Sequence, residues 1–209
     1  AVSFTTADVQ LGNGADLTVT TARGAIRANN IDRTSDEDVT LSSTGGAANT
    51  VSVGAIGTGT ANGINTVALT GATSVTLNGN ITTSSATGNS VTVTGPALLG
   101  AGVTINTSAN VTDQTGAISF TSTIDNAQAL TLTAGAADVT VGGAIGNTAA
   151  LSSLTITGND ISLANIGGGS SGVTGASSVT ATDGADTALL TLSGTTYKTA
   201  GTQAYTGGT

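Results

Sequence analysis

The residues of this chain whose chemistry could serve a ligand or a reaction are few, and most of them are acidic. One cluster of four acidic side chains lies within residues 32–38, and a second pairs Asp183 with Asp186 in the run TDGAD. The chain has no His and no Cys, which removes the usual nucleophile and base pairs and most transition-metal sites. Hard cations prefer carboxylate and carbonyl oxygens. Asp36, Asp38, Asp183 and Asp186 are therefore candidate calcium ligands.

The same clusters could serve as catalytic pairs, because enzymes that cleave polysaccharides use two carboxylates and some of these enzymes are β-helical. Neither cluster is accompanied by the basic and aromatic side chains that would hold a sugar. The loops also lack the GGxGxD pattern of calcium-bound β-rolls, and residues 36–38 are typical of a solvated corner. The Gly-rich run 167–169 precedes neither a helix nor a Lys, so no phosphate loop is predicted. We predict no catalytic residue and no cofactor, with calcium as the one metal hypothesis.

The elements that must carry these residues are short strands, which are clearest between Gly116 and Gly167. Runs in which Val, Ile or Leu alternate with Thr or Ser are each closed by Gly, Asn or Asp. Such alternation places apolar side chains on one side of an extended strand and hydroxyl side chains on the other. The pattern predicts an all-β chain.

Composition indicates a narrow core. Aromatic residues make up 2% of the chain, and 31 Gly accompany a core that must be built from Ala, Val, Ile and Leu. The net charge is -8, and the only cations are Arg23, Arg27, Arg33 and Lys198, so nucleic acid is not a predicted partner. No apolar run approaches the ~20 residues of a membrane helix, so membrane insertion is not predicted either.

The chain also matches itself at a distance of about 90 residues. VSVGAIG from Val51 aligns with VTVGGAIG from Val139, and VALTG from Val67 aligns with LTITG from Leu154. We therefore divide the chain into a first repeat at 1–95, a continuous second repeat at 96–188 and a partial repeat or tail at 189–209.

The irregular spacing of the strands favours a right-handed parallel β-helix, in which loops of free length join short strands. At roughly 20–25 residues for each turn, the chain would make about nine turns. The alternative is a pair of antiparallel β-sandwiches with a linker near Gly95 and Pro96.

Outward threonines suggest one further surface. If Thr-x-Thr pairs stacked in a flat file on successive turns, the face would suit ice or a glycan, although Thr is also simply a favoured residue on exposed strands. The pairs are Thr92/Thr94, Thr131/Thr133 and Thr155/Thr157.

Four segments resemble repeats in bacterial surface proteins of the filamentous haemagglutinin type: GAISFTSTID, LTLTAGAADVTVGGAIG, LSSLTITGNDISL and TAGTQAYTG. The resemblance implies a right-handed β-helix in a secreted adhesin or surface fibre, located at the cell surface or outside the cell, with a host surface or glycan as a partner. The Asn-Pro-Asn-Gly secretion motif of that family and an Arg-Gly-Asp tripeptide are not in this sequence.

Together these observations predict a non-catalytic structural segment of a bacterial cell-surface adhesin or extracellular fibre. Because a β-helix exposes unpaired strand edges at both ends, we expect self-association by end-to-end stacking into filaments. The alternatives are an ice- or glycan-binding module that uses an outer Thr-rich face, and a β-helical carbohydrate-active enzyme.

Overall fold

The computed structural model describes residues 1–33, 36–57, 63–84, 90–110, 115–168, 172–182 and 187–207, and in this part of the chain every strand pairing is parallel and no helix occurs. The strands form three long faces that run the length of the molecule. Face 1 contains β1 (Val2–Phe4), β4 (Ile26–Ala28), β7 (Thr50–Val53), β9 (Ser74–Leu77), β12 (Ala97–Leu99) and β15 (Ile124–Asp125), and it continues through single-residue bridges at Ile145, Ile166 and Tyr197.

Face 2 contains β2 (Val9–Gln10), β5 (Ile31–Asp32), a bridge at Ile56, β10 (Ile81–Thr82), β13 (Val103–Asn106), β16 (Ala129–Thr133), β18 (Ser153–Gly158), β20 (Ser177–Ala181) and β22 (Gln203–Thr206). Face 3 contains β3 (Leu17–Thr21), β6 (Val39–Ser43), β8 (Val67–Gly71), β11 (Val91–Thr94), β14 (Ile118–Phe120), β17 (Val139–Val141), β19 (Ile161–Leu163) and β21 (Leu190–Leu192).

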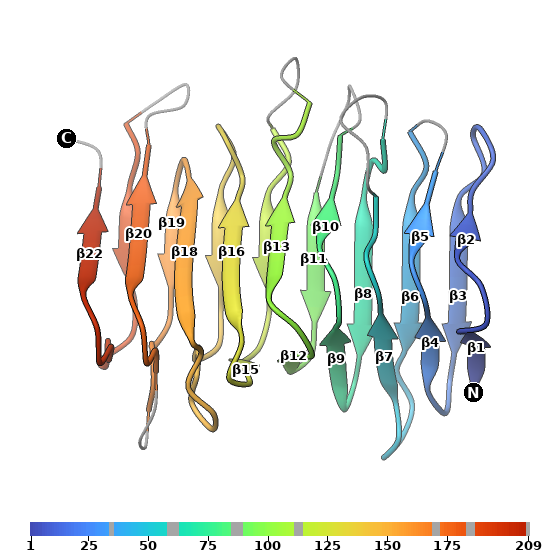
Figure 1. Ribbon diagram of the computed structural model, residues 1–209, viewed down its shortest axis with the longest axis horizontal. Coiled ribbons are helices and arrows are strands. Elements are labelled where there is room, and N and C mark those ends of the chain that lie inside the picture. Colours follow the sequence, from blue (N-terminus) through green and yellow to red (C-terminus); the bar gives the residue numbers. More distant parts are fainter. Residues whose placement is uncertain are drawn as a thin grey trace.

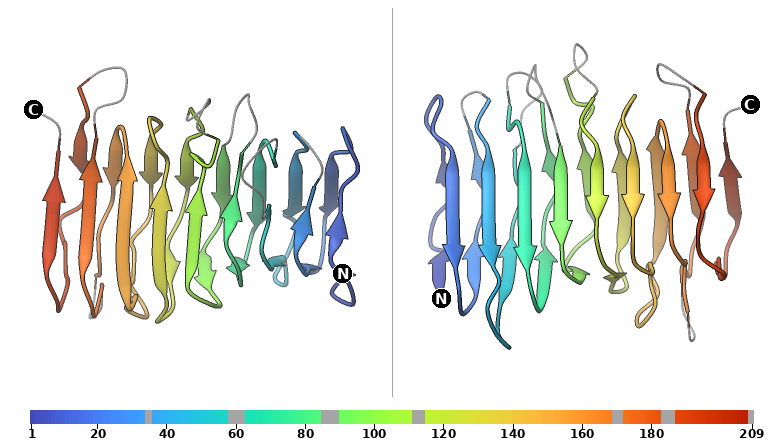
Figure 2. Two further views of the ribbon diagram at one scale, coloured as in Figure 1. Left: turned by 45° about the horizontal axis from the view of Figure 1, so that its top comes forward. Right: turned by 180° about the vertical axis from the view of Figure 1, so that it is seen from behind.

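The chain visits faces 1, 2 and 3 in that order and then repeats the cycle, which makes a β-solenoid (Figure 1). The nearer strands β13, β16 and β18 run upward while the chain advances from right to left, and the view from behind agrees (Figure 2), so the coil is right-handed. The predicted parallel β-helix is therefore confirmed, and the antiparallel sandwich is wrong.

The prediction of about nine turns was slightly too high, because the structure has about eight. The corners explain the difference. Equivalent residues one turn apart are separated by 22 positions between Asp16 and Asp38, but by 28 between Asp38 and Thr66 and by 29 between Asp160 and Leu189. Since corner loops accept extra residues without disturbing the strands, the longer loops use up chain that would otherwise form another turn.

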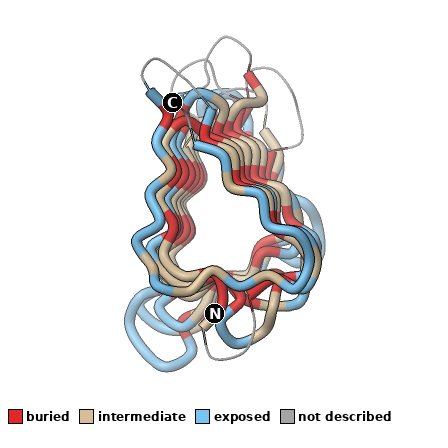
Figure 3. The backbone as a smooth tube through the Cα atoms, turned by 90° about the vertical axis from the view of Figure 1, so that its left-hand side faces the viewer, coloured by how far each residue is buried: buried red, intermediate tan, exposed pale blue. Residues whose placement is uncertain are grey.

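The core is one continuous stack of inward side chains. Strands such as β6 and β8 alternate buried and partly exposed residues, as the sequence pattern predicts. Ile31, Ile56 and Ile81 stack directly on one another in adjacent turns, and each is fully buried. Viewed along the rod, successive turns superpose and their buried positions coincide (Figure 3). The ladder passes through Gly95 and Pro96 without a break, since these residues form the corner between β11 and β12.

Strand length is not constant along a face. On face 2, β2, β5 and β10 have two residues each, whereas β16 has five and β18 has six. On face 3 the change is opposite, because β3, β6 and β8 have five residues each and β17, β19 and β21 have three. The long side of the coil therefore moves from face 3 to face 2 near the middle of the rod.

The segments that match in sequence follow this displacement. Val51 lies in β7 on face 1, whereas its counterpart Val139 lies in β17 on face 3. The bridging residue Ile56 is on face 2, and its counterpart Ile145 is on face 1. Each matched segment in this region has thus moved back by one face.

Candidate functional site

Aspartates tie adjacent turns together at the corner that precedes face 3. The Oδ1 atom of Asp16 accepts a hydrogen bond of 2.9 Å from the backbone N–H of Asp38, which is the equivalent residue one turn later. Asp138 accepts from Asp160 in the same way at 3.2 Å, and Asp160 accepts from Leu189 at 2.8 Å. These carboxylates satisfy corner N–H groups that the strand ladders do not reach. Their role is structural.

Asparagines make the same tie at the other corners. Asn30 Oδ1 accepts from the N–H of Ala55 at 2.9 Å, and Asn80 Oδ1 accepts from the N–H of Thr104 at 2.8 Å. Asn165 Oδ1 accepts from Thr196 at 3.1 Å. These ties were not predicted, although the sequence carries a signal for them: Asp or Asn stands directly before many of the apolar-x-apolar runs.

The acidic side chains of the first cluster differ in exposure and in hydrogen bonding. Asp36 is exposed and has a φ of 49°. Glu37 is fully buried, and its Oε1 accepts a hydrogen bond of 3.3 Å from the N–H of Gly14. Asp38 Oδ1 accepts three hydrogen bonds, from Asn65 Nδ2 at 3.0 Å, from the N–H of Thr66 at 3.0 Å and from Thr66 Oγ1 at 2.8 Å. The structure therefore uses Asp38 as a corner tie.

No group of three or more acidic side chains that could hold a metal occurs among the residues that the structure describes. Asp183 and Asp186 lie outside the described residues. Calcium binding at these two residues, and at Asp36 with Asp38, stays a prediction.

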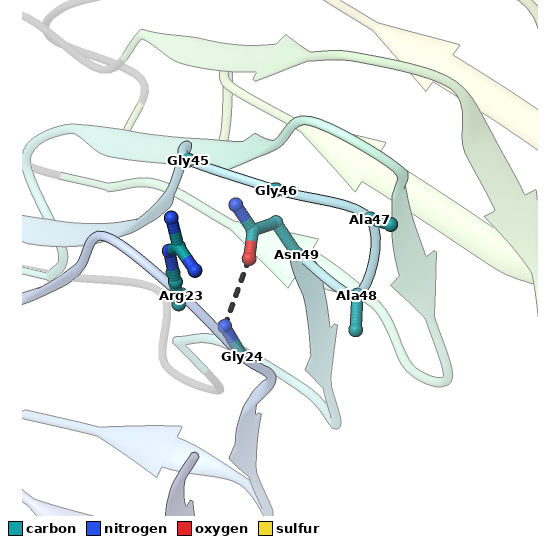
Figure 4. Close-up of a pocket in the computed structure, with 7 residues that line it drawn as sticks. All are labelled: Arg23, Gly24, Gly45, Gly46, Ala47, Ala48 and Asn49. Carbon is teal, nitrogen blue, oxygen red and sulfur yellow. Dashed lines mark hydrogen bonds between the residues drawn. The ribbon is translucent and has the colours of Figure 1, made fainter.

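A shallow pocket of about 340 Å³ lies at the corner between β6 and β7 (Figure 4). Its lining is Arg23, Gly24, Gly45, Gly46, Ala47, Ala48 and Asn49. The Asn49 side chain is buried, and its Oδ1 accepts a hydrogen bond of 2.8 Å from the N–H of Gly24, so this amide also ties two turns together. Arg23 is the one charged side chain of the lining. The seven residues offer an anion contact at most, with no acid and base pair.

Outward threonines form a regular array on face 2. Thr131 and Thr133 of β16 lie in register with Thr155 and Thr157 of β18, so the two Thr-x-Thr pairs stack on successive turns. The array continues in β20 through Ser178 and Thr180. Within the described residues, none of these hydroxyls makes a hydrogen bond to the protein. They are therefore free to bind water or a ligand.

The third predicted pair, Thr92 and Thr94, lies on a different face. These residues belong to β11, where Thr94 stacks on Thr70 but Thr92 stacks between Ala68 and Ser119. Face 2 thus carries the more regular hydroxyl array.

The two ends of the rod expose apolar side chains that would be buried in its middle. Leu192 of the last turn, which stacks on the fully buried Leu163, is 41% exposed; Leu189 is 59% exposed but lies at the outward corner position that Asp160 holds one turn earlier. At the opposite end, the inward-facing residues Val2, Phe4 and Val19 are only partly buried. The strand edges there have one partner instead of two, because β1 pairs only with β4.

No protein-family model matches this chain, and comparisons with curated proteins and with solved structures found no significant match. The fold is that of a β-helical repeat protein. No helix in the described residues has the length and hydrophobicity needed to cross a membrane.

Proposed function

We propose that this chain is a non-catalytic structural segment of a bacterial cell-surface adhesin or extracellular fibre, which builds a rigid rod outside the cell. The observation that carries the proposal is that Asp and Asn side chains at the corners hydrogen-bond to the backbone of the adjacent turn. Asp16, Asp138, Asn30 and Asn165 each bind a backbone N–H in the next turn. Side chains that could otherwise hold a substrate are thereby committed to joining turns.

A rod of this kind gains stiffness from its interfaces. Each turn contacts the turn before and the turn after it through parallel ladders on all three faces. In such solenoids the stability is close to a sum of the turns and their nearest-neighbour contacts. Bending must strain several ladders and the continuous core together. The surface location rests on the resemblance of GAISFTSTID and the three other segments to the filamentous haemagglutinin type.

The ends of the rod supply a means of self-association. Leu192 and the unpaired edge of β21 at one end, with Val2, Phe4 and β1 at the other, would be buried by head-to-tail contact. Unpaired strand edges are templates for strand addition, which contributes backbone hydrogen bonds as well as apolar burial.

Electron microscopy of the purified 209-residue chain tests this proposal. We expect filaments whose width is that of one rod, together with a concentration-dependent increase of mass in sedimentation. A chain that stays monomeric at high concentration would remove the self-association.

A second candidate function is the binding of ice or a glycan by the face 2 array. The register of Thr131 with Thr155 and of Thr133 with Thr157 supports it, because it spaces hydroxyls by ~4.8 Å along the rod and by roughly 7 Å along each strand. Hydroxyls at these spacings can hold ordered water.

Thermal hysteresis and glycan-array binding test this candidate. If face 2 binds ice or a glycan, Thr155→Tyr should abolish the signal, because a bulky side chain interrupts the regular hydroxyl array. The matched control is Thr40→Tyr on face 3, which should keep it. The candidate fails if the unaltered chain gives no signal in either assay.

A further inference from the structure

Asn-Gly pairs can react as well as form turns, and the chain contains three of them, at 13–14, 62–63 and 78–79. The side-chain amide of Asn can be attacked by the backbone nitrogen of the next residue, and glycine has no Cβ to hinder that approach. Because the dipeptide is the same each time, its surroundings must decide which pair reacts. Asn62 lies outside the described residues, which leaves the pairs 13–14 and 78–79 for comparison.

The pair at 13–14 lies in an exposed turn at the corner before β3. Asn13 and Gly14 are both exposed, and the turn is closed by a hydrogen bond of 2.9 Å from the N–H of Ala15 to the carbonyl oxygen of Gly12. The N–H of Gly14 donates at 3.3 Å to Oε1 of Glu37, a fully buried side chain in the next turn. The nitrogen that would attack Asn13 therefore already has a carboxylate on its proton.

We propose that Asn13 is a self-modification site, at which the Glu37 carboxylate is the general base that converts the asparagine to aspartate and isoaspartate. Glu37 Oε1 takes the proton from the nitrogen of Gly14, and that nitrogen forms a bond to Cγ of Asn13. The bond between Cγ and Nδ2 breaks, and Nδ2 leaves as ammonia with the proton that Glu37 returns. A cyclic imide remains. A base within hydrogen-bond reach of the proton it removes fits this role.

Water completes the reaction, and it can reach the site because Asn13 and Gly14 are exposed. Addition of water to one imide carbonyl restores the normal backbone and gives aspartate. Addition to the other carbonyl gives isoaspartate, in which the backbone runs through the side-chain carbons. The sum of the steps replaces an amide NH₂ with OH and releases ammonia, so the reaction needs no oxidant or reductant.

The matched pair at 78–79 is held against the same reaction. Asn78 Nδ2 donates to Ser52 Oγ at 3.0 Å and to the carbonyl oxygen of Val53 at 3.1 Å, so the group that must leave is bound twice. Gly79 packs so closely on the preceding turn that a Cβ would lie 2.6 Å from the nitrogen of Ala55. Among the described residues, no carboxylate accepts from the N–H of Gly79. The pair therefore lacks the base and the freedom to react.

Ageing of the purified 209-residue chain in neutral buffer tests the proposal. Cleavage by trypsin after Arg23 releases peptide 1–23, in which Asn13 is the only asparagine, so mass spectrometry can follow its mass gain and fragment ions can locate it. In the folded chain we expect conversion at Asn13 to be at least about tenfold faster than at Asn78. In guanidinium chloride the two rates should become similar, because the surroundings are lost.

Glu37→Gln separates the base from the turn, because an amide oxygen still accepts the N–H of Gly14 but does not take its proton. Conversion at Asn13 should slow at least about tenfold, less than the ~100-fold or more of an optimised enzymatic base. The rate at Asn78 should stay unchanged. Asn13→Gln is the negative control and should remove the mass gain at this position, and circular dichroism checks that both variants are folded.

Two results would overturn the role of Glu37. One is equal conversion at Asn13 and Asn78 in the folded chain. The other is an unchanged rate at Asn13 in a folded Glu37→Gln variant. If that variant does not fold, the comparison of Asn13 with Asn78 in the unaltered chain, folded and unfolded, decides the question by itself.

Discussion

Two segments of the rod, Val51–Gly57 and Val139–Gly146, build the same local structure on different sides of the molecule. Each supplies two buried valines in a short strand, then a fully buried isoleucine that bridges adjacent turns, then a glycine in the left-handed region. The first segment occupies faces 1 and 2, and the second occupies faces 3 and 1. The strand, the corner and the bridging residue therefore form one structural unit that can occur on different faces. The local sequence of this unit does not specify the face on which it lies.

The two sequence repeats differ in side-chain volume at a matched buried position, and a substitution there tests how far their packing is alike. Phe120 in β14 is 1% exposed and stacks between Val93 and Val141, whereas its counterpart Ala28 in β4 stacks between Phe4 and Val53. Phe120→Ala gives β14 the residue of its counterpart without the neighbouring aromatic ring, so it should leave a cavity and lower the free energy of unfolding by about 3–5 kcal/mol. Urea denaturation measures the loss, and Phe120→Leu should recover most of it.

The bridging isoleucines test whether the unit is energetically the same on both faces. Ile56 and Ile145 are fully buried, and each stacks between two other isoleucines. Ile56→Ala and Ile145→Ala should each lower the free energy of unfolding by about 2–5 kcal/mol. We expect the two losses to agree within about 1 kcal/mol, which is less than the spread of such losses between unlike sites. A much larger difference between the two losses would mean that packing around the isoleucine depends on the face on which it lies and not on the local structural unit.

The glycines that follow the bridges should behave as a second matched pair. Gly57 and Gly146 have φ values of 66° and 65°. A Cβ at Gly57 would press on the carbonyl oxygen of Thr82, and one at Gly146 would press on that of Gly172. Gly57→Ala and Gly146→Ala should each cost about 1–3 kcal/mol in thermal or urea unfolding. Gly12→Ala is the control, because nothing lies within 4 Å of a Cβ there, and it should be near neutral.

The corner aspartates should differ between the two halves by the number of hydrogen bonds they accept. Asp38 Oδ1 accepts three and Asp160 Oδ1 accepts one. Asp160→Ala should cost about 1 kcal/mol, and Asp38→Ala should cost about 2–3 kcal/mol because more donors lose their acceptor. The exposed Asp36 is the control, and Asp36→Asn should change the free energy of unfolding by less than about 0.5 kcal/mol. Equal losses at Asp38 and Asp36 would contradict the assignment of Asp38 as a tie.

Much of this architecture could be predicted from local patterns. Alternation of Val, Ile and Leu with Thr specifies which side of each strand is buried, and left-handed glycines such as Gly95 lie at corners, as their backbone freedom predicts. The roles of the polar residues were harder to predict. Asp38 was a candidate calcium ligand in the sequence, yet its partners Asn65 and Thr66 lie one turn later and become neighbours only when the coil closes.

The sequence by itself determined that each short run is a strand with one buried side, because strand periodicity is a property of the run. Only the tertiary structure decided the face on which each run lies, since that depends on how many strands and bridges precede the run in the coil. Val51 and Val139 satisfy the same inward requirement on face 1 and face 3, because both are fully buried in a parallel ladder. The Thr-x-Thr array on face 2 is a consequence of that placement.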